Sequence, residues 1–399
     1  MFNETQLTKY ADVLIWAMQR ARKNKFKKND IIVIRYDKPT IELAQIVYQK
    51  ILEIGMHPIQ RMNLTSKMEL SFFTASNNKQ LTFLPPGDDE LYSSLNGSIF
   101  LYAPESITHL SNIDPKKIAI TSISRKRLRD ILDKREEIGD FGWTLCIYPT
   151  QELANHANIS IEEYSDQIIS SCFLNDEFPV LKWQETFKEI SKIKTWLNSL
   201  KIKKLHIESQ NIDLEIYPGD KRKWAGISGH NIPSFEVFIS PDYRKTRGIY
   251  YADQPSYRSG NYVKGIKIEF EKGVAINVSA NEGEEFAKNQ FSMDRGASRV
   301  GEFSLTDKTF SRINKFMANT LFDENYGGEN GNCHLALGSS YSDTYDGDAR
   351  ELTKDLKQKL GFNDSALHWD LVNTENKRVT AYLKSGEKRT IYENGKFNS

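Results

Sequence analysis

The sequence predicts a two-domain protein, with an N-terminal α/β domain and a C-terminal α+β domain. A length of 399 residues suits two domains of ordinary size. The first 170 or so residues alternate helical and strand patterns, which favours a mainly parallel sheet with flanking helices. From about residue 203, strands alternate apolar and polar residues between glycine-containing turns, as half-buried antiparallel strands do.

The elements of the N-terminal half follow from the spacing of apolar residues. Apolar residues three and four apart predict a helix over residues 7–21, and the apolar run at residues 30–34 predicts a strand covered on both faces. Helical spacing returns at residues 40–54, where Gly55 is placed to end the helix. Residues 57–61 then form a second strand, and this βαβ unit implies a parallel sheet.

The alternating series continues toward residue 200. Further strands are expected at residues 98–102, 118–121 and 143–148. Helices are expected at residues 125–137, 162–173 and 183–200, the last leading out of the domain. Together these elements predict an N-terminal domain of residues 1–200.

The C-terminal domain, residues 201–399, is predicted to carry a mixed or antiparallel sheet. Its strands are expected at residues 205–208, 212–216, 262–270 and 274–278. Glycines in the intervening turns are Gly219, Gly226, Gly229, Gly260 and Gly273. We expect this domain to carry the functional site.

Composition excludes several classes of protein. Hydrophobic residues make up 39% and aromatic residues 11%, which is enough to build cores and excludes a disordered tail protein. With 54 Lys+Arg against 53 Asp+Glu, the formal charge of +1 argues against a dedicated nucleic-acid binder. Two basic runs, residues 20–28 and 125–129, lack interleaved aromatics and are interpreted as solvated helix faces.

Cysteine usage and the lack of long apolar segments bear on location. The three cysteines are too few for a disulfide framework or a Cys-based zinc site, and an odd number suits a reducing compartment. The first 23 residues lack the apolar core of a signal peptide, and no stretch approaches about 20 apolar residues. We therefore expect a soluble cytoplasmic protein with no membrane partner.

Five residues of the C-terminal half combine metal-binding chemistry with apolar surroundings. They are Glu236, Glu302, His334, His368 and Asp370. His368 and Asp370 lie two apart in a strand-like segment, so alternation puts both on one face. Three carboxylates and two imidazoles, with one carboxylate bridging, suit two divalent ions about 3.5–4 Å apart. The alternative is an ordinary α+β domain with buried hydrogen-bond networks, since a buried carboxylate can be paired instead of metal-bound.

The sequence lacks the common motifs of nucleotide-binding proteins, serine hydrolases and HExxH zinc proteases. A Walker A sequence, a GxGxxG after a strand, a GxSxG elbow and an HExxH are all missing. The other five histidines are more typical of surface or satisfied core positions than of ligands: His57, His109, His156, His206 and His230.

Four ordered segments of the C-terminal half resemble one family. They read NIPSFEVFISPD at residues 231–242, DRGASRVGE at 294–302, NCHLALGSSY at 332–341 and SALHWD at 365–370. In these segments, and over nearly the whole chain, the sequence resembles the thermophilic-metalloprotease-type aminopeptidases. That group includes aminopeptidase T, aminopeptidase S and PepS-like enzymes. Phe235 stands where the family often has a second Glu, and a glycine-rich loop precedes His334, so substrate preference stays open.

The resemblance implies a function and a role for each residue. It implies a metal-dependent aminopeptidase that removes N-terminal residues from peptides, with two divalent ions (Zn, Co or Mn) and a homodimeric assembly. Glu302 would be the bridging ligand, and the terminal ligands would be Glu236, His334, His368 and Asp370. Tyr341 would donate a hydrogen bond to the oxyanion, and a nearby carboxylate or a metal could anchor the amino terminus. Hydrolysis of another aminoacyl amide and a catalytically silent binding role are the alternatives.

Overall fold

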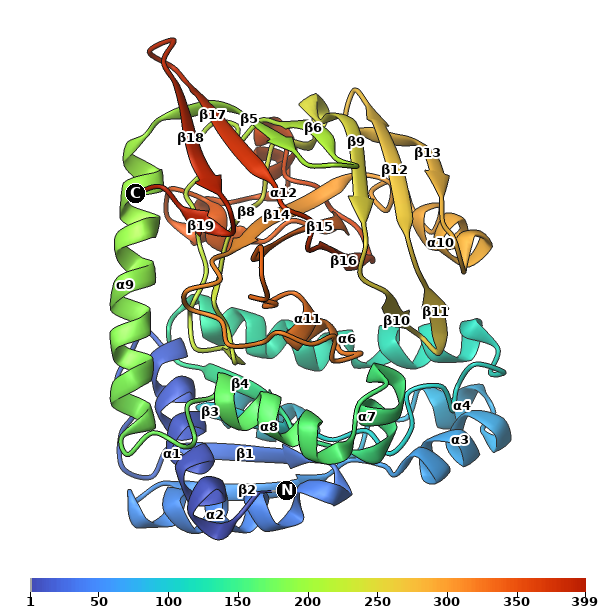
Figure 1. The fold of residues 1–399 in the computed structure, drawn as a ribbon. Helices are drawn as coiled ribbons and strands as arrows, with labels where there is room; N and C mark the ends of the chain where they lie inside the picture. Colours follow the sequence, from blue (N-terminus) through green and yellow to red (C-terminus); the bar gives the residue numbers. More distant parts are fainter. Residues whose placement is uncertain (1) are drawn as a thin grey trace. The chain divides into compact units, whose positions relative to one another are not determined.

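The computed structural model describes residues 2–399, which form two compact units (Figure 1). The first unit runs to Trp183 and also contains Ser228–Pro233. The second comprises Gln184–Ile227 and Ser234–Ser399. Helix α9 (Pro179–Ser199) carries the chain from the first unit into the second. The predicted division into two domains near residue 200 is a proposal that separate expression of the two halves would test.

The first unit is built on a five-stranded sheet in the order β2-β1-β3-β4-β7, in which all the pairs are parallel. Its strands are β1 (Ile31–Tyr36), β2 (His57–Met62), β3 (Gly97–Tyr102), β4 (Gly142–Ile147) and β7 (Asn231–Ile232). Strand β1, which lies between β2 and β3, buries Ile32, Val33 and Ile34 in succession, which is typical of a strand with both faces covered. The predicted parallel sheet is therefore confirmed.

Helices connect and flank these strands. They are α1 (Glu4–Ala21), the 3₁₀ turn η1 (Lys38–Thr40), α2 (Ile41–Glu53), α3 (Ser66–Ala75), α4 (Asn78–Leu81), α5 (Asp88–Ser94), α6 (Pro115–Glu137), α7 (Gln151–Ala157) and α8 (Ile161–Ser171). Helix α1 begins with a capping box between Asn3 and Gln6. Its apolar stripe, from Leu7 to Met18, is buried, as the spacing in the sequence predicts.

Two of the predicted strands are wrong, one in its type and one in its extent. Residues 118–121 do not form a strand, because they lie inside α6, whose N-cap Asp114 accepts a hydrogen bond from the Lys116 N–H and whose first residue is Pro115. Both residues are helix-start signals that outweigh a short apolar run. The predicted strand over residues 262–270 is two strands, which separate near Gly265, a residue with φ of +65°.

The second unit contains a large antiparallel sheet of eight strands in the order β13-β12-β9-β6-β5-β17-β18-β19. Its strands are β5 (Ile202–Glu208), β6 (Asp213–Ile216), β9 (Arg247–Ala252), β12 (Ile266–Glu271), β13 (Val274–Ser279), β17 (Arg378–Leu383), β18 (Lys388–Glu393) and β19 (Lys396–Phe397). A two-stranded hairpin, β10 (Ser256–Arg258) and β11 (Asn261–Val263), is separate from it.

A smaller antiparallel sheet of the second unit has the order β16-β15-β14-β8. Its strands are β8 (Glu236–Ile239), β14 (Val300–Thr306), β15 (Asn332–Gly338) and β16 (His368–Asn373). The helical elements of this unit, besides α9, are η2 (Tyr243–Lys245), α10 (Glu284–Phe291), α11 (Thr320–Asp323), η3 (Ser342–Thr344), η4 (Ala349–Glu351) and α12 (Lys354–Leu360). The observed mixture of sheets and short helices confirms the α+β class predicted for the C-terminal part.

Two buried tyrosines of the large sheet bind the backbone of the small sheet. The Tyr250 hydroxyl on β9 donates to the Leu371 carbonyl at 2.6 Å, and the Tyr392 hydroxyl on β18 donates to the Thr306 carbonyl at 2.8 Å. These bonds satisfy polar groups in a buried region, so they help to fix the small sheet in place. Within the described part of the chain, no helix combines the length and apolar character needed to cross a bilayer.

Candidate metal centre

The small sheet gathers the five candidate ligands on one face. Its register sets Ser304 opposite His334, and Ala336 opposite Asp370. Paired residues point to the same side of a sheet, and side chains two apart on a strand do the same. The face that follows from this pairing, which we term the acidic face, carries Glu236, Glu302, His334, His368 and Asp370. His368 and Asp370 lie two residues apart on β16, so the register places both on this face, as the sequence predicts.

The opposite face of the same sheet is apolar. Phe303, Leu335 and Leu371 point there and are buried. Because a one-residue slip would exchange the two faces, the burial of these side chains fixes which residues turn toward the acidic face. Sequence alternation thus positions the ligands through the packing of their neighbours.

Small residues leave space between the acidic side chains. Ser304 and Ala336 occupy positions on this face between the larger groups. The pairing of β14 with β15 shifts its register between Val300 and Glu302. At Gly301, which lies between them, a Cβ would be 2.3 Å from the Ser339 carbonyl oxygen. Only glycine fits that close backbone approach, which explains the Val-Gly-Glu order of the segment.

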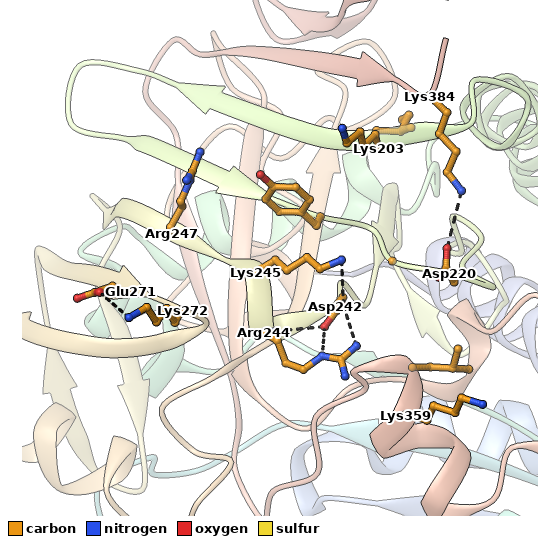
Figure 2. A pocket seen from close by; sticks show the side chains of 14 residues that line it. Lys203, Asp220, Asp242, Arg244, Lys245, Arg247, Glu271, Lys272, Lys359 and Lys384 are labelled. Carbon is orange, nitrogen blue, oxygen red and sulfur yellow. Dashed lines mark hydrogen bonds and ion pairs between the residues drawn. The ribbon is translucent and has the colours of Figure 1, made fainter. Parts of the chain in front are cut away.

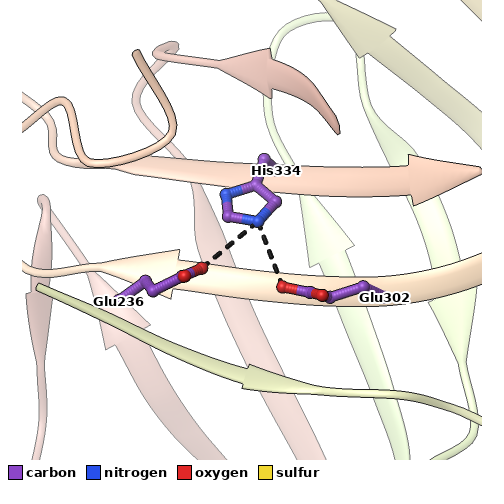
Figure 3. A group of neighbouring side chains, drawn as sticks. All are labelled: Glu236, Glu302 and His334. Carbon is purple, nitrogen blue, oxygen red and sulfur yellow. Dashed lines mark hydrogen bonds and ion pairs between the residues drawn. The ribbon is translucent and has the colours of Figure 1, made fainter. Parts of the chain in front are cut away.

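His334 lies at the centre of the acidic face (Figure 3). Its Nε2 is 3.3 Å from Glu236 Oε2, 3.3 Å from Glu302 Oε1 and 3.8 Å from Asp370 Oδ1. Ligand atoms of Glu236, Glu302 and His334 all lie within 4.8 Å of one another. These separations match three groups that converge on a common ion.

His368 approaches the same carboxylates from the neighbouring strand. Its Nε2 is 3.3 Å from Asp370 Oδ1 and 3.8 Å from Glu302 Oε2. Its Nδ1 is 2.9 Å from the Ser339 carbonyl oxygen, which can only accept a hydrogen bond. The proton therefore sits on Nδ1 when the ring is neutral, and the Nε2 lone pair faces the carboxylates, as in most metal-binding histidines.

The buried charges perturb one another strongly. Burial is the main cause that raises the pKa of Glu236 to about 7, and the Glu302 charge adds to it. Burial opposes protonation of His334, but its hydrogen bond with Glu302 and the Glu236 charge outweigh that effect and raise its pKa to about 9. Burial likewise opposes ionisation of Asp370, but His368 outweighs it and lowers the pKa of Asp370 to about 2. Protons on the imidazoles thus supply positive charge here, and a bound cation would replace them.

Tyr341 stands beside this cluster. Its ring centre is 4.6 Å from that of His368 and 5.8 Å from that of Phe238. The residue is 45% exposed, which makes it accessible to a substrate. Although the residue as a whole is partly exposed, loss of solvation at its hydroxyl and the negative charges of Glu302 and Asp370 raise the pKa of that group, so the phenol keeps its proton.

Asp294 ties together the loops that precede two ligand-bearing strands. Its carboxylate accepts hydrogen bonds from the Gly296 and Ala297 N–H groups just before β14. It also accepts from the Ser365 hydroxyl and the Ala366 N–H just before β16. Burial opposes ionisation, but these donors outweigh it and lower the pKa of Asp294. The aspartate that opens the DRGASRVGE segment therefore holds together the loops that lead into β14 and β16.

The donor set fits a divalent-metal centre. Carboxylate oxygens and imidazole nitrogens are ligands that Zn, Co and Mn accept. Glu302 Oε2 is buried without a hydrogen-bond partner in residues 2–399, and so is His334 Nδ1. An unpaired buried carboxylate oxygen is costly, and a cation between the carboxylates would satisfy it. The five sequence-predicted ligand residues lie together, and the residues present suit the ion that the resemblance implies.

Glu324 is a buried acid that sequence reasoning missed. It follows α11, and burial is the main cause that raises its pKa well above the usual value, with the charges of Glu236, Asp370 and Glu302 adding to it. It stands outside every pattern that marked the other carboxylates. Its one sequence signal is an acidic pair, Asp323-Glu324, inside an otherwise apolar and amide-rich segment.

A second charged region of this unit is a surface hollow of about 660 Å³, which we term the basic pocket (Figure 2). Seven of its lining residues are basic and three acidic: Lys203, Arg244, Lys245, Arg247, Lys272, Lys359 and Lys384, with Asp220, Asp242 and Glu271. Each acid lies near a cation, with Asp242–Arg244 at 2.7 Å, Glu271–Lys272 at 3.6 Å and Asp220–Lys384 at 3.8 Å. Its lining contains none of the five candidate ligands, so we do not assign the reaction to it.

The basic runs and the other histidines take structural positions. In the first run Arg22 is buried and pairs with Asp30 at 2.6 Å, and in the second Arg127 pairs with Asp89 at 2.6 Å. Four of the remaining histidines lie within 3.2 Å of a carboxylate: His109, His156, His206 and His230. The pairings of Arg127 and of the histidines agree with structural roles, whereas Arg22 is buried and is therefore not part of a solvated helix face.

Comparisons with known proteins give relatives over 64–72% of the chain and a solved structure of similar fold over 99% of it. The chain is 28% identical to aminopeptidase 2 of Geobacillus stearothermophilus over 306 residues, which cover 72% of each chain. It is 27% identical to aminopeptidase AmpS of Bacillus subtilis over 266 residues, 64% of this chain and 62% of the relative, so that alignment spans less than two thirds of AmpS. The solved structure of wild-type AmpT from Thermus thermophilus has a TM-score of 0.81 over 99% of both chains. At 19% identity that likeness concerns the fold.

The family assignment rests on a match over nearly the full length. Residues 3–397 match the sequence model of the thermophilic metalloprotease (M29) family. All four segments that suggested the resemblance lie inside this range, and the resemblance is confirmed. The chain belongs to the thermophilic metalloprotease family.

Proposed function

We propose that this chain is a metal-dependent aminopeptidase that removes N-terminal residues from peptides and uses two divalent ions held on the acidic face. One observation carries the proposal. The two oxygens of Glu302 face different imidazoles, with Oε1 3.3 Å from His334 Nε2 and Oε2 3.8 Å from His368 Nε2. A carboxylate that faces two other ligands through separate oxygens suits the bridging position of a two-ion site.

The remaining ligands divide around Glu302. Glu236 lies on the His334 side, and Asp370 lies nearest His368. The Ser304 hydroxyl donates to Glu236 Oε2 at 2.8 Å, and the Ser339 carbonyl orients His368, so both outer ligands are held by their surroundings. When bound, divalent ions supply a water of lowered pKa and polarise the scissile carbonyl.

Tyr341 supplies the hydrogen bond that the reaction requires from the protein. Its half-exposed position next to His368 suits a phenol that donates to the oxygen of the scissile carbonyl as negative charge develops there. Asp294 holds the loops before Glu302 and His368 and has no direct contact with substrate in this assignment. Homodimeric assembly and a cytoplasmic location stay predictions from the sequence.

The test is metal-dependent turnover. The protein is stripped with a chelator and reloaded separately with zinc, cobalt or manganese. It is then assayed on aminoacyl fluorogenic amides and on their N-acetylated counterparts. We expect turnover that a metal restores, that is confined to substrates with a free amino group, and that needs about two ions per chain. Turnover of acetylated amides would indicate another amidase, and failure of every metal to restore turnover would overturn the proposal.

A further inference from the structure

The basic pocket gathers cations from segments that lie far apart in the chain (Figure 2). Lys203 lies on β5, Lys245 on η2 and Lys359 on α12. Lys272 lies in the turn between β12 and β13, and Lys384 directly follows β17. The hollow of about 660 Å³ is within the range of about 300–1,000 Å³ that small-molecule sites occupy. The fold, and not a basic run in the sequence, therefore concentrates this charge around a space of ligand size.

Backbone hydrogen bonds fix the segments that line the basic pocket. The Asp242 N–H donates to the Tyr217 carbonyl at 2.9 Å, and the Tyr243 N–H donates to the Gly361 carbonyl at 3.3 Å. These bonds join the end of β6, the start of η2 and the end of α12. The walls of the pocket are therefore formed before a ligand arrives, which lowers the entropy cost of binding.

The three acids of the pocket leave most of its positive charge uncompensated. The Asp242 side chain is 4% exposed, and its two oxygens accept from the Arg244 guanidinium at 2.7 Å and 2.9 Å. The side chains of Asp220 and Glu271 are 86% and 62% exposed, so water screens their longer pairings with lysines. One acid is thus occupied by a single arginine, and the other two lie in solvent.

Two cations of the lining have no acid of their own. Within residues 2–399, neither Lys203 nor Lys359 forms an ion pair, and both are exposed. Lys245 Nζ lies 3.8 Å from Asp242, the acid that already binds Arg244. With seven basic residues against three acidic ones, the lining carries an excess of four positive charges at neutral pH. A concave surface with charge of one sign attracts a ligand of the opposite sign.

Arg222 adds a partly buried cation next to this lining. Its Nη2 donates to the Leu360 carbonyl at 3.0 Å, and its Nε donates to the Ser240 carbonyl at 2.7 Å. Carbonyl oxygens carry no net charge, so these bonds leave the guanidinium charge in place. Burial lowers the pKa of Arg222 to about 10, and it stays protonated at neutral pH. Because Leu360 ends α12, the first bond also occupies a helix-end carbonyl that would otherwise repel an anion.

We propose that the basic pocket binds the polyphosphate group of a small molecule, which is either a nucleotide or an inorganic polyphosphate. Several linked phosphates can contact lysines and arginines on separate walls at once, and charge-assisted hydrogen bonds to phosphate oxygens are strong. The pocket is concave and the formal charge of the chain is only +1, which favours a small anion over an extended nucleic acid. The Tyr217 ring also lines the hollow and offers a surface on which a nucleotide base stacks. This inference goes beyond the reaction proposed for the acidic face and does not depend on it.

The test is calorimetric titration of the intact chain with tripolyphosphate, and with inorganic phosphate for comparison. We expect one site per chain that binds tripolyphosphate more tightly than phosphate and that weakens as the salt concentration rises. The double variant Lys203→Gln/Lys359→Gln removes the two cations that lack an acid. It should bind tripolyphosphate about 10–100-fold more weakly, as expected for the loss of hydrogen bonds to a charged group.

Two controls separate a specific site from general attraction and from the metal centre. Lys67→Gln/Lys188→Gln makes the same change in net charge on two exposed lysines of α3 and α9, and it should bind like the wild type. Polyphosphates also bind metal ions, so Glu302→Gln, which alters the acidic face, is titrated as well and should keep its affinity for tripolyphosphate. Melting temperatures show whether each variant is folded.

Each outcome decides the inference. Failure of the wild type to bind tripolyphosphate overturns it, as does equal affinity in Lys203→Gln/Lys359→Gln. Equal weakening in the control pair would mark general attraction, and loss of binding in Glu302→Gln would assign the phosphates to the metal centre, so either result also overturns it. A short single-stranded RNA that binds where tripolyphosphate does not would replace the small anion with a nucleic acid.

A parallel titration with ATP distinguishes the two sources of the polyphosphate group. Tighter binding of ATP than of tripolyphosphate, with the gain removed by Tyr217→Leu, supports a nucleotide that stacks its base on the ring. Equal affinity for the two compounds supports an inorganic polyphosphate. Because none of these measurements uses turnover, failure of the aminopeptidase proposal would leave the inference about the basic pocket unaffected.

Discussion

The acidic face and the basic pocket are both dense in charge, yet they differ in how the charge is compensated. In the basic pocket the cations are largely exposed, 63% for Arg247 and 88% for Lys272, and each acid has a cation near it. On the acidic face, the Glu302 side chain is 3% exposed, and its Oε2 has no hydrogen-bond partner among the described residues. Solvent screens exposed pairs, so they contribute little, whereas three buried carboxylates that share two imidazoles favour a bound cation. Charge density alone is therefore a poor guide to the reaction site.

The largest effect is expected from Glu302→Gln, because it removes the carboxylate that faces both imidazoles. Aminopeptidase turnover should fall by more than about 10³-fold, and metal content after dialysis should fall with it. The check is the turnover number together with metal analysis. Glu269→Gln, which alters an exposed glutamate of β12, should match the wild type. A Glu302→Gln protein with full metal and full activity would contradict the assignment.

Tyr341→Phe tests the oxyanion role on the same face. We expect the turnover number to fall about 10²-fold with metal content unchanged, because the hydroxyl acts only as negative charge develops. Steady-state kinetics on an aminoacyl amide measures this, and equal metal content in the variant is the control. A change in KM alone would instead place Tyr341 in substrate binding.

Asp294→Asn should have an intermediate effect on both stability and activity. In this variant an NH₂ group, which cannot accept a hydrogen bond, replaces one carboxylate oxygen. The variant therefore loses some of the hydrogen bonds that join the loops before β14 and β16. The free energy of unfolding should fall by about 1–3 kcal/mol, and kcat/KM by about 10-fold, through misplaced ligands. Urea unfolding and kinetics provide the two readouts. Asp364→Asn, an exposed neighbour of Ser365, should change neither, and equal losses in both variants would refute the positioning role.

The smallest effect is expected from Glu215→Gln, next to the basic pocket. Burial opposes ionisation of Glu215, but hydrogen bonds from Arg247 and Lys204 outweigh it and lower its pKa to about 2. A lowered folded-state pKa gives stability that is present above the unfolded-state value of 4.5 and is lost as pH falls toward about 2.

Replacing Glu215 should therefore cost about 1 kcal/mol at neutral pH, and less as the pH falls below about 4.5. Urea unfolding at several pH values measures the difference, and peptide hydrolysis should be unchanged. A loss of activity in Glu215→Gln would show that the basic pocket takes part in the reaction, and the contrast between the two regions would then break down.

Much of the acidic face could be read from the sequence because it depends on local patterns. The alternation of His368 and Asp370 follows from strand geometry, and the segments around Glu236, Glu302 and His334 follow from a family resemblance. Glu324 could not be read in this way. Its place depends on hydrogen bonds from Thr306, Asn332 and Phe235 that join a turn to three strands, and such long-range contacts leave no periodic signal.

The error at residues 118–121 has a local cause. A short apolar run fits a strand and a buried helix equally well, and periodicity cannot separate them. The decisive signals were the Asp114 cap and Pro115 at the first helical position, which precede the run. Helix-start chemistry therefore deserves more weight than apolarity when an apolar run is only a few residues long.

The small sheet also determines at which stage of folding the five candidate ligands come together. Its strands are drawn from segments between Glu236 and Asn373, and the pairing of β16 with β15 brings in the final two candidate ligands, His368 and Asp370. Pairings between strands far apart in the chain are slow to form, because loop closure costs entropy before contacts compensate for it. A growing chain on the ribosome thus exposes only fragments of the ligand set. Strong ion affinity and the native fold of this sheet should therefore arise together.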